Sequence, residues 1–364
     1  MTIPRSLDLH LPYITEGLQG IGGVLRSTPE LFRVEEVPAY DPIGYGDHIF
    51  LNVTKSLKTT RDTQIELAEL FDLHREDVGH AGLKDKYAVT TQTFSLLIPN
   101  IEPKTVAETV ESNLGISVNW FSRHPKKLRS GHLKGNKFWI TITDIESTRT
   151  ALETAELIRE RINAVGLPNF YGVQRIGVKG DNVKQGYDII KGFYKEYNRW
   201  LRRYLVSSYL SYICNIYITE RIKRGSFTQL LKGDLAKKHD TGGVFTVEDL
   251  SLEQPRSESK EISFTAPIFG FKMRETKSEA KKFEDEIFAL SGLTIEDLRR
   301  CGASGTRRMG RLFPEMQLQE EPEGLTIVFT LPAGGYATVL LREFMKTEEI
   351  SIEADEPDIE VDES

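Results

Sequence analysis

The stretch from His80 to Gln92 constrains this chain most, because it combines a cluster of charges with a change in backbone conformation. Gly82 permits backbone angles that other residues avoid, and residues 90–98 are rich in residue types that favour β-strands. The charged triplet at residues 84–86 is therefore expected where a loop enters a strand. Extended backbone there would place the two lysines on one side and Asp85 on the other.

Asp85 is the candidate catalytic residue of this triplet. Flanking positive charge keeps a carboxyl group ionised at neutral pH, which suits a nucleophile or a base and does not suit a general acid. A solvated Lys-Asp-Lys turn explains the same residues, and the pattern taken alone favours that interpretation.

The charges are unevenly distributed, which changes what the net charge of −7 implies. Residues 348–364 contain nine acidic residues and no basic one, and the rest of the chain has 47 Lys and Arg against 45 Asp and Glu. Residues 123–137 contain six Lys or Arg and residues 299–311 contain five Arg, both without an acid. Such clusters predict phosphate binding, although two solvated loops would share this composition. The candidate phosphate contacts are Lys126, Lys127, Arg129, Lys134, Arg307, Arg308 and Arg311.

Length and composition are typical of a globular protein of two domains. The chain has 364 residues, of which 39% are hydrophobic and 28% charged. No apolar run is long enough for a membrane span, and the N-terminus lacks the apolar core of a signal peptide, so a cytoplasmic location is expected. Two cysteines cannot form a metal cluster, and the seven histidines include no His-x-x-x-His pair, so no metal site is expected.

Residue periodicity and caps predict the order of the elements. We expect strands at 23–26, 31–37, 46–54, 90–98, 116–122, 135–143 and 325–331. We expect helices at 59–71, 103–113, 147–165, 182–191, 198–224, 278–290 and 336–346. Residues 251–260 are expected to form a polar loop, and residues 265–270 a turn-rich passage.

Residues 81–92, AGLKDKYAVTTQ, resemble the signature of the archaeal-type TruD family of tRNA pseudouridine synthases, Gly-x-Lys-Asp-x-x-Ala-x-Thr-x-Gln. A second family signature is matched by GLPNFYGVQRIG at 166–177, and a third by LPAGGYATVLLRE at 331–343. The fixed positions of the first signature are all present, as Gly82, Lys84, Asp85, Ala88, Thr90 and Gln92. Shorter matches occur at Pro29, Phe32, Val34, Glu36 and Gly46-Asp47-His48.

The resemblance implies roles for individual residues. Asp85 is then the catalytic nucleophile, and Lys84, Asn136, Phe138, Tyr336 and Arg26 bind the substrate. An amide such as Asn136 can read a uracil edge, and a ring such as Phe138 can stack on a base. Arg26 stands where the family carries Lys, which weakens its assignment. Tyr336 stands where the family often has Phe, a change that keeps stacking and leaves only the role of the hydroxyl open.

The resemblance also implies a fold and an activity. The expected class is α+β: a pseudouridine synthase catalytic domain, built on a mixed and largely antiparallel sheet with flanking helices, at 1–165 and 313–347. An inserted α/β domain is expected at 166–312, and 348–364 is expected to be a disordered acidic tail. The activity would be isomerisation of uridine 13 in tRNA to pseudouridine, without cofactor or metal, by an enzyme expected to be a monomer with no membrane partner.

Two other classes of protein compete with this interpretation. A glycoside hydrolase could pair Asp85 with Glu35 or Glu36, although such sites favour aromatic residues beside acids, and here the aromatic residues accompany basic loops. A non-catalytic RNA-binding protein would explain the basic clusters but leaves the Lys84-Asp85 signature without a purpose. Within the enzyme hypothesis, Asp85 could attack the ribose, add to the uracil ring or abstract the ribose 2′ proton.

Overall fold

The computed structural model describes residues 7–25 and 28–347, and its central feature is an eight-stranded mixed sheet. Its strands run in the order β13-β14-β6-β1-β4-β2-β5, with β3 paired to β4. In these two ranges only the β1–β4 pair of this sheet is parallel, and its other pairs are antiparallel. The predicted α+β class with a largely antiparallel sheet is therefore confirmed. The strands are β1 (Phe32–Pro38), β2 (His48–Ser56), β3 (Val78–His80), β4 (Val89–Leu97), β5 (Ser117–His124), β6 (Leu133–Ile142), β13 (Met316–Glu321) and β14 (Gly324–Pro332).

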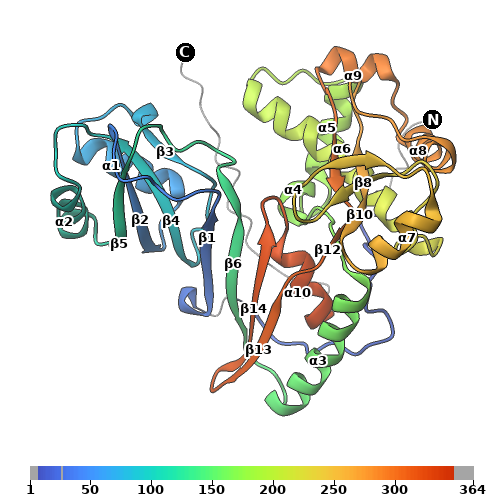
Figure 1. Ribbon diagram of the computed structural model, residues 1–364, viewed down its shortest axis with the longest axis horizontal. Helices are drawn as coiled ribbons and strands as arrows, with labels where there is room; N and C mark the ends of the chain where they lie inside the picture. The colour runs from blue at the N-terminus through green and yellow to red at the C-terminus, as the bar shows by residue number, and fades with distance from the viewer. Residues whose placement is uncertain (1–6, 26–27, 348–364) are drawn as a thin grey trace.

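The two edges of the sheet are covered differently. Helices α1 (Thr60–Leu70) and α2 (Pro103–Leu114) pack on β2, β3 and β4 and enclose a core of their own (Figure 1). Helices α3 (Thr148–Val165) and α10 (Ala337–Met345) belong to a larger core that includes β1, β6 and β14. Along β6, Phe138, Ile140 and Ile142 are buried on one face, and Thr141 between the last two is buried as well.

The chain between α3 and β13 forms a second body, on the right of Figure 1. Its centre is α6, and its strands form a four-stranded sheet, β11-β10-β8-β9, and a two-stranded pair, β7 with β12. None of these strands joins the eight-stranded sheet, which supports the proposed insertion at about 166–312. Its helices are α4 (Val173–Ile176), α5 (Asp181–Lys191), α6 (Arg199–Lys223), α7 (Leu250–Glu258), α8 (Ser278–Leu290) and α9 (Ile295–Cys301). Its strands are β7 (Leu167–Pro168), β8 (Leu235–Lys238), β9 (Val244–Thr246), β10 (Ile262–Ile268), β11 (Thr306–Met309) and β12 (Arg311–Leu312).

Several predicted element boundaries match the capping chemistry. The side chain of Thr59 caps α1 in a reciprocal capping box with Asp62, and that of Ser147 caps α3. Gly166 ends α3 at a φ of 89°, a conformation that favours glycine. The structure described here also contains two short 3-10 helices, at Pro29–Leu31 and Arg75–Asp77.

Three predicted elements were wrong. The expected strand at 23–26 is reduced, in its described part, to a single bridge between Val24 and Thr143. The expected polar loop at 251–260 contains α7, which the side chain of Asp249 caps. The expected turns at 265–270 overlap β10, whose Pro267 lies opposite Arg307 of β11. The elements that were not predicted include helices α4 and α9 and strands β3, β7, β8, β9, β11, β12 and β13.

None of the helices in the two described ranges is long and apolar enough to cross a membrane.

Candidate active site

A cavity of about 720 Å³ lies between the eight-stranded sheet and the second body. Five segments of the sheet lobe and residues of helices α4 and α6 of the second body form its walls. It is lined by Phe32, Val34, Thr59, Leu83, Lys84, Asp85, Asn136, Phe138, Gln174, Arg175, Trp200, Arg203, Tyr204, Ser207 and Gly334 to Thr338. Among these described lining residues Asp85 is the only carboxylate. The cavity thus brings together Asp85, Lys84, Asn136, Phe138 and Tyr336, which are far apart in the sequence.

The loop that carries Asp85 is held by buried hydrogen bonds. The backbone N–H of Lys84 donates to the hydroxyl of Thr60 (2.8 Å), which in turn donates to Oε1 of Gln92 (2.9 Å). The amide of Gln92 donates to the carbonyl oxygen of Gly82 (3.3 Å), which closes the network. Three fixed positions of the first signature, Gly82, Lys84 and Gln92, therefore hold the backbone beside Asp85, whose side chain remains half-buried at the cavity.

The side chain of Lys84 points into the protein, where its Nζ atom lies 2.9 Å from Oε2 of Glu36 on β1. Lys86 lies in different surroundings, half-buried near the ring of Tyr87. The prediction that the two lysines lie on one side and Asp85 on the other is wrong. Residues 82–88 are bends and irregular backbone and do not form an extended strand. Lys84 still lines the cavity, but its charge is already neutralised by Glu36.

The structure argues against the glycoside hydrolase alternative, because neither Glu35 nor Glu36 is available to pair with Asp85. Glu36 forms an ion pair with Lys84, and its Oε1 atom accepts a hydrogen bond from the backbone N–H of Thr93 (3.4 Å). Glu35 is exposed and, as its neighbour on the strand, points to the opposite face of the sheet. Neither residue lines the cavity with Asp85, so the described structure contains no carboxylate pair of that kind.

Asn136 and Phe138 project from the same face of β6 into the cavity, as predicted. The Phe138 ring stacks on Phe329 of the neighbouring strand β14, with ring centroids 5.0 Å apart and planes 19° apart. The Oδ1 atom of Asn136 is buried and has no hydrogen-bond partner. A buried acceptor without a partner costs about 1–3 kcal/mol, so this atom is prepared for a donor that a ligand would bring.

Tyr336 of the third signature immediately precedes helix α10 and packs against the second signature. Its ring meets Tyr171 edge to face, with centroids 5.8 Å apart. A Cβ atom added to Gly172 would lie 2.8 Å from Oγ1 of Thr338 and 3.0 Å from the Tyr336 ring, so only glycine allows this approach. Oγ1 of Thr338 is itself buried and has no hydrogen-bond partner.

Arg308 ties the second and third signatures together. Its Nε atom donates to the carbonyl oxygen of Asn169 (2.7 Å), and its Nη2 atom donates to that of Gly334 (2.8 Å). The guanidinium also lies over the ring of Tyr171, 4.1 Å from its centroid. Arg308 was predicted to contact phosphate; in this structure its hydrogen bonds position the loop before Tyr336.

The wall that faces the sheet is a surface of α6 that the sequence analysis missed. Trp200, Arg203, Tyr204 and Ser207 follow the spacing i, i+3, i+4, i+7 and therefore share one helical face. The rings of Trp200 and Tyr204 stack with centroids 5.4 Å apart and planes 9° apart. No sequence signal separates this surface from the rest of the helix, because aromatic residues such as Tyr209 and Tyr217 also lie on its buried face.

Arg175 of the second signature completes this wall. Its guanidinium lies over the Tyr204 ring, 5.0 Å from the centroid, and the Tyr204 hydroxyl donates to the carbonyl oxygen of Gln174 (2.7 Å). Burial raises the pKa of Tyr204, so its hydroxyl stays protonated as a donor. Arg175 and the exposed Arg203 give the wall a positive charge opposite Asp85.

Two of the predicted phosphate contacts are buried, which contradicts that prediction for them. Arg307 pairs with Glu284, and only 7% and 3% of the two side chains are exposed. Arg311 is 3% exposed and its Nη2 atom donates to the carbonyl oxygen of Ser257 (3.0 Å). Burial lowers the pKa of Arg311 to about 10. The side chains of both arginines lie in the packed interior of the second body and do not face solvent.

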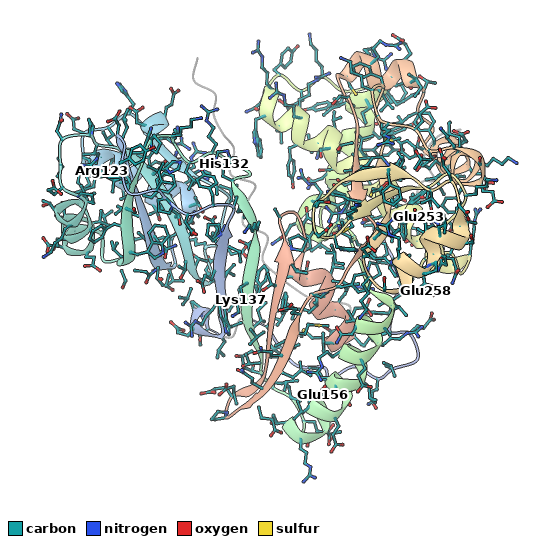
Figure 2. All side chains as sticks on the ribbon, in the orientation of Figure 1. Arg123, His132, Lys137, Glu156, Glu253 and Glu258 are labelled. Atoms are coloured by element: carbon teal, nitrogen blue, oxygen red, sulfur yellow. The ribbon has the colours of Figure 1, made fainter. Side chains whose placement is uncertain are left out.

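The other basic cluster, at 123–137, is at the surface and connects β5 to β6. Figure 2 shows Arg123 and His132 at the same end of the sheet lobe, with Lys137 further along β6. Lys126, Arg129 and Lys134 are exposed, and Nζ of the half-buried Lys127 donates to the carbonyl oxygen of Glu76. Arg26, also predicted to bind the substrate, lies outside the described residues, as does the acidic tail at 348–364.

Within the described ranges, no group of three or more His, Cys, Asp or Glu residues is placed to hold a metal ion.

Comparison with known proteins identifies the family. The sequence model described as tRNA pseudouridine synthase D (TruD) matches residues 8–201 and 194–344. A tRNA pseudouridine synthase D of Thermus thermophilus is 40% identical over 338 residues, which are 93% of this chain and 92% of that protein. The protein of the same name from an Anaeromyxobacter species is 40% identical over 354 residues, covering 95% and 99%.

The fold agrees with the sequence comparison. A crystal structure from Methanosarcina mazei, described as a putative TruD, superimposes with a TM-score of 0.76, covering 95% of this chain and 99% of the other at 22% identity. This likeness shows a shared fold. The match to the family model and the 40% identical relatives show that this chain belongs to the TruD family of tRNA pseudouridine synthases.

Proposed function

We propose that this chain is a tRNA pseudouridine synthase that isomerises a uridine of tRNA, at position 13 as its family membership implies, with Asp85 as the catalytic residue. The observation that carries the proposal is the cavity itself. One carboxylate lies there with an amide whose Oδ1 atom has no partner and with the rings of Phe138 and Tyr336, and a positively charged wall faces them. The 40% identical relatives named tRNA pseudouridine synthase D support the same conclusion.

The reaction needs few chemical groups. The bond from ribose C1′ to uracil N1 breaks, the base turns, and C1′ bonds to C5, whose hydrogen leaves as a proton while N1 gains one. The reaction involves no net oxidation or reduction and imports no group, so the chain's own residues suffice. A carboxylate at Asp85 serves as nucleophile toward the ribose or the ring, or as the base for the 2′ proton.

The cavity residues suit a uridine that has left the RNA stack. Extrusion costs a few kcal/mol, which stacking on Phe138 and Tyr336 helps to offset. The Phe138 ring already stacks on Phe329, so little of its conformational entropy is lost when a base stacks on it. The buried Oδ1 atom of Asn136 accepts the N3–H of uracil, the donor that this atom lacks in the protein alone.

The RNA backbone would contact cations on both sides of this cavity. Arg175 and Arg203 contribute from the second body, and the exposed Lys126, Arg129 and Lys134 contribute from the sheet lobe. We propose that a monomer carries out the reaction, because Asp85, Asn136, Phe138 and Tyr336 meet in a cavity within a single chain. The buried free thiols of Cys214 and Cys301 fit the reducing cytoplasm, where we place the activity.

Release of tritium from tRNA labelled at C5 of uridine tests the proposal. Purified protein with chelator present should transfer tritium to water while RNA length and mass stay constant. Asp85→Asn should retain the wild-type unfolding midpoint and RNA affinity but release no tritium, because an amide is neither nucleophile nor base. A protein that only binds RNA would release none even as wild type, and a hydrolase would liberate free uracil or sugar.

A further inference from the structure

A second cavity, of about 800 Å³, lies in the sheet lobe at the end where β2 begins and β5 ends. His48 and His124 face each other there as partners in the β2–β5 register. The loop before β2 and the basic loop after β5 close the cavity, whose volume is within the range of small-ligand sites. None of its lining residues is shared with the cavity at Asp85.

The cavity contains a pre-formed aromatic platform. The ring of Tyr40 stacks on His124, with centroids 5.2 Å apart and planes 29° apart. The Tyr40 hydroxyl is hydrogen-bonded to Nδ1 of His132 (2.9 Å), and Phe50 packs against His124 with centroids 4.9 Å apart. Because each ring contacts another, the platform needs little ordering when a flat ligand arrives.

Two imidazole nitrogens of the histidines that line this cavity have no hydrogen-bond partner. The Nδ1 atoms of His48 and His124 are both buried and unpaired. Burial lowers the pKa of both rings, and the charges of Lys127 near His48 and Lys126 near His124 lower it further. Neutral imidazoles donate or accept hydrogen bonds as the tautomer allows, which suits the edge of a nucleobase and not a phosphate.

The entrance of the cavity carries positive charge. Lys126 and Arg129 are exposed, and the only carboxylate among the described lining residues is the exposed Asp41. The surrounding loops are fixed in place: the N–H of Leu128 donates to Oγ of Ser95 (2.9 Å), and a Cβ atom added to Gly46, at a φ of 117°, would lie 2.4 Å from the Pro125 nitrogen. These cations are therefore held beside the platform, as a phosphate site requires.

We propose that this cavity binds a second nucleotide of the RNA substrate, distinct from the uridine that is isomerised. The base stacks beside Tyr40 and His124 and hydrogen-bonds with the free imidazole nitrogens, while its phosphates meet Lys126 and Arg129. The inference rests on the proposed function, because that function supplies RNA as the ligand. It extends that function by adding a recognition site away from the reacting atoms.

The cavity has a direct connection to the catalytic loop, which gives such a nucleotide a use. The N–H of Gly131 in the basic loop donates to the carbonyl oxygen of Ala81 (2.8 Å), a few residues before Asp85. Ala81 and Leu128 are buried together with Phe50 in one small core. A nucleotide held by the basic loop would therefore fix the register of the RNA relative to Asp85.

Chemical probing of bound tRNA tests this inference, with reagents that modify unpaired base edges. The parent protein carries Asp85→Asn, so that the RNA stays unmodified. One base other than the target uridine should be protected in the parent complex and become reactive in the His48→Ala/His124→Ala variant, with affinity about tenfold weaker. A second variant, Lys126→Gln/Arg129→Gln, changes only exposed side chains and should weaken binding without unfolding. His74→Ala, at an exposed histidine of the same lobe, is the matched control.

The outcomes separate this inference from the proposed function. If wild-type protein releases tritium but the double histidine variant protects the same bases as its parent with equal affinity, the cavity does not bind the RNA and the inference is overturned. If AMP and UMP bind to the cavity as tightly as tRNA and no base is protected, the cavity is a site for free nucleotides and the inference is equally overturned. Absence of tritium release together with histidine-dependent protection would remove the proposed activity and leave the second nucleotide site standing.

Discussion

The Nζ atom of Lys84 and Oε2 of Glu36 lie 2.9 Å apart, with only 3% and 2% of the two side chains exposed. Lys84 directly precedes Asp85, and Glu36 belongs to β1, which pairs with both β4 and β6. The ion pair therefore connects the loop of Asp85 to β1, the strand between β4 and β6 in the sheet. The lysine of the signature acts on Asp85 through the backbone, in addition to any effect of its charge.

We expect Glu36→Gln to destabilise the protein by about 3–5 kcal/mol, because it leaves the Lys84 ammonium buried without a counter-charge. The Lys84→Met/Glu36→Leu double variant, which removes both charges, should be far less destabilised. Urea unfolding measures both free energies. Glu66→Gln breaks the half-exposed pair of Lys58 with Glu66 and, as the control, should cost less than about 1 kcal/mol. A loss in Glu36→Gln as small as in this control would show that the buried pair is dispensable.

Asn136→Ala should lower the rate of isomerisation while leaving stability unchanged or slightly raised. The buried Oδ1 atom has no partner in the protein, so its removal relieves an uncompensated desolvation of about 1–3 kcal/mol. Single-turnover tritium release and urea unfolding give the two quantities. Asn52→Ala is the matched control: its side chain donates to Oγ1 of Thr93 (3.2 Å) and accepts from Asn119, so its loss should destabilise. Normal activity in Asn136→Ala would contradict the proposed base contact.

The stability of this protein should fall as the pH decreases from about 6.5 to about 4. Burial, followed by the charges of Lys84 for His80 and Arg311 for His239, lowers the pKa of both histidines to about 4. The unfolded chain therefore binds more protons than the folded protein between these pH values, which favours unfolding. Above about pH 6.5 both histidines are neutral in the folded and the unfolded state, and the full stability is present. Urea unfolding at several pH values should give a shallower dependence for His80→Gln/His239→Gln. Identical curves for wild type and variant would show that neither buried histidine resists protonation.

Arg203→Gln should reduce the dependence of tRNA affinity on salt by about one unit of slope, because one phosphate contact is lost. Arg203 lines the cavity, whereas the equally exposed Arg199 on the same helix does not. Arg199→Gln should consequently leave the slope nearer that of wild type. Binding titrations between low and moderate salt measure this difference. Equal slopes for the two variants would place the RNA away from this face of α6.

Arg307→Gln should give the opposite combination of effects. Its guanidinium is buried against Glu284 and donates to Oγ1 of Thr265 (2.9 Å), so the substitution should destabilise the fold and leave the salt slope of RNA binding intact. Thermal unfolding and binding titrations on the same preparation decide the matter. A lower salt slope at unchanged stability would restore Arg307 to the RNA surface.

Elements with strong local signals were predictable from the sequence. Helix α3 has a Ser147 cap, an amphipathic apolar face and a terminal glycine, and α8 was predicted at its observed bounds. The second body was harder, because its strands are short and its turns use residues that usually break structure. Pro267 could enter β10 because β8 pairs only with residues 262–264, so the proline has one side without a strand partner. Helix α7 contains Pro255 and polar residues, a composition that favours a loop until Arg311 and β10 pack against it.

The side of the cavity that contains Asp85 followed from the signatures, because short motifs carry residue identity even when their spatial relationship is unknown. Asp85, Asn136, Phe138 and Tyr336 do line one cavity. The opposite wall depended on which face of α6 turns toward the sheet, which only tertiary packing decides. Arg307 and Arg311 were misassigned for a related reason. A count of positive charges does not distinguish solvent-facing arginines from those whose partners, such as Glu284, lie far along the chain.

The pairing of β6 with β14 has a consequence for how this protein folds during its synthesis on the ribosome. On the edge of β6 that faces β14, Ile142 pairs with Leu325 and Gly135 with Pro332, which are synthesised much later. At ordinary rates of synthesis, this edge of β6 waits roughly 10–40 s for its neighbour. During that time a strand with the buried Phe138, Ile140 and Ile142 has an open backbone edge, the kind of surface that pairs with other nascent chains. Strand β6, which contributes Phe138 to the cavity, is therefore also the segment for which a chaperone would be most useful until translation ends.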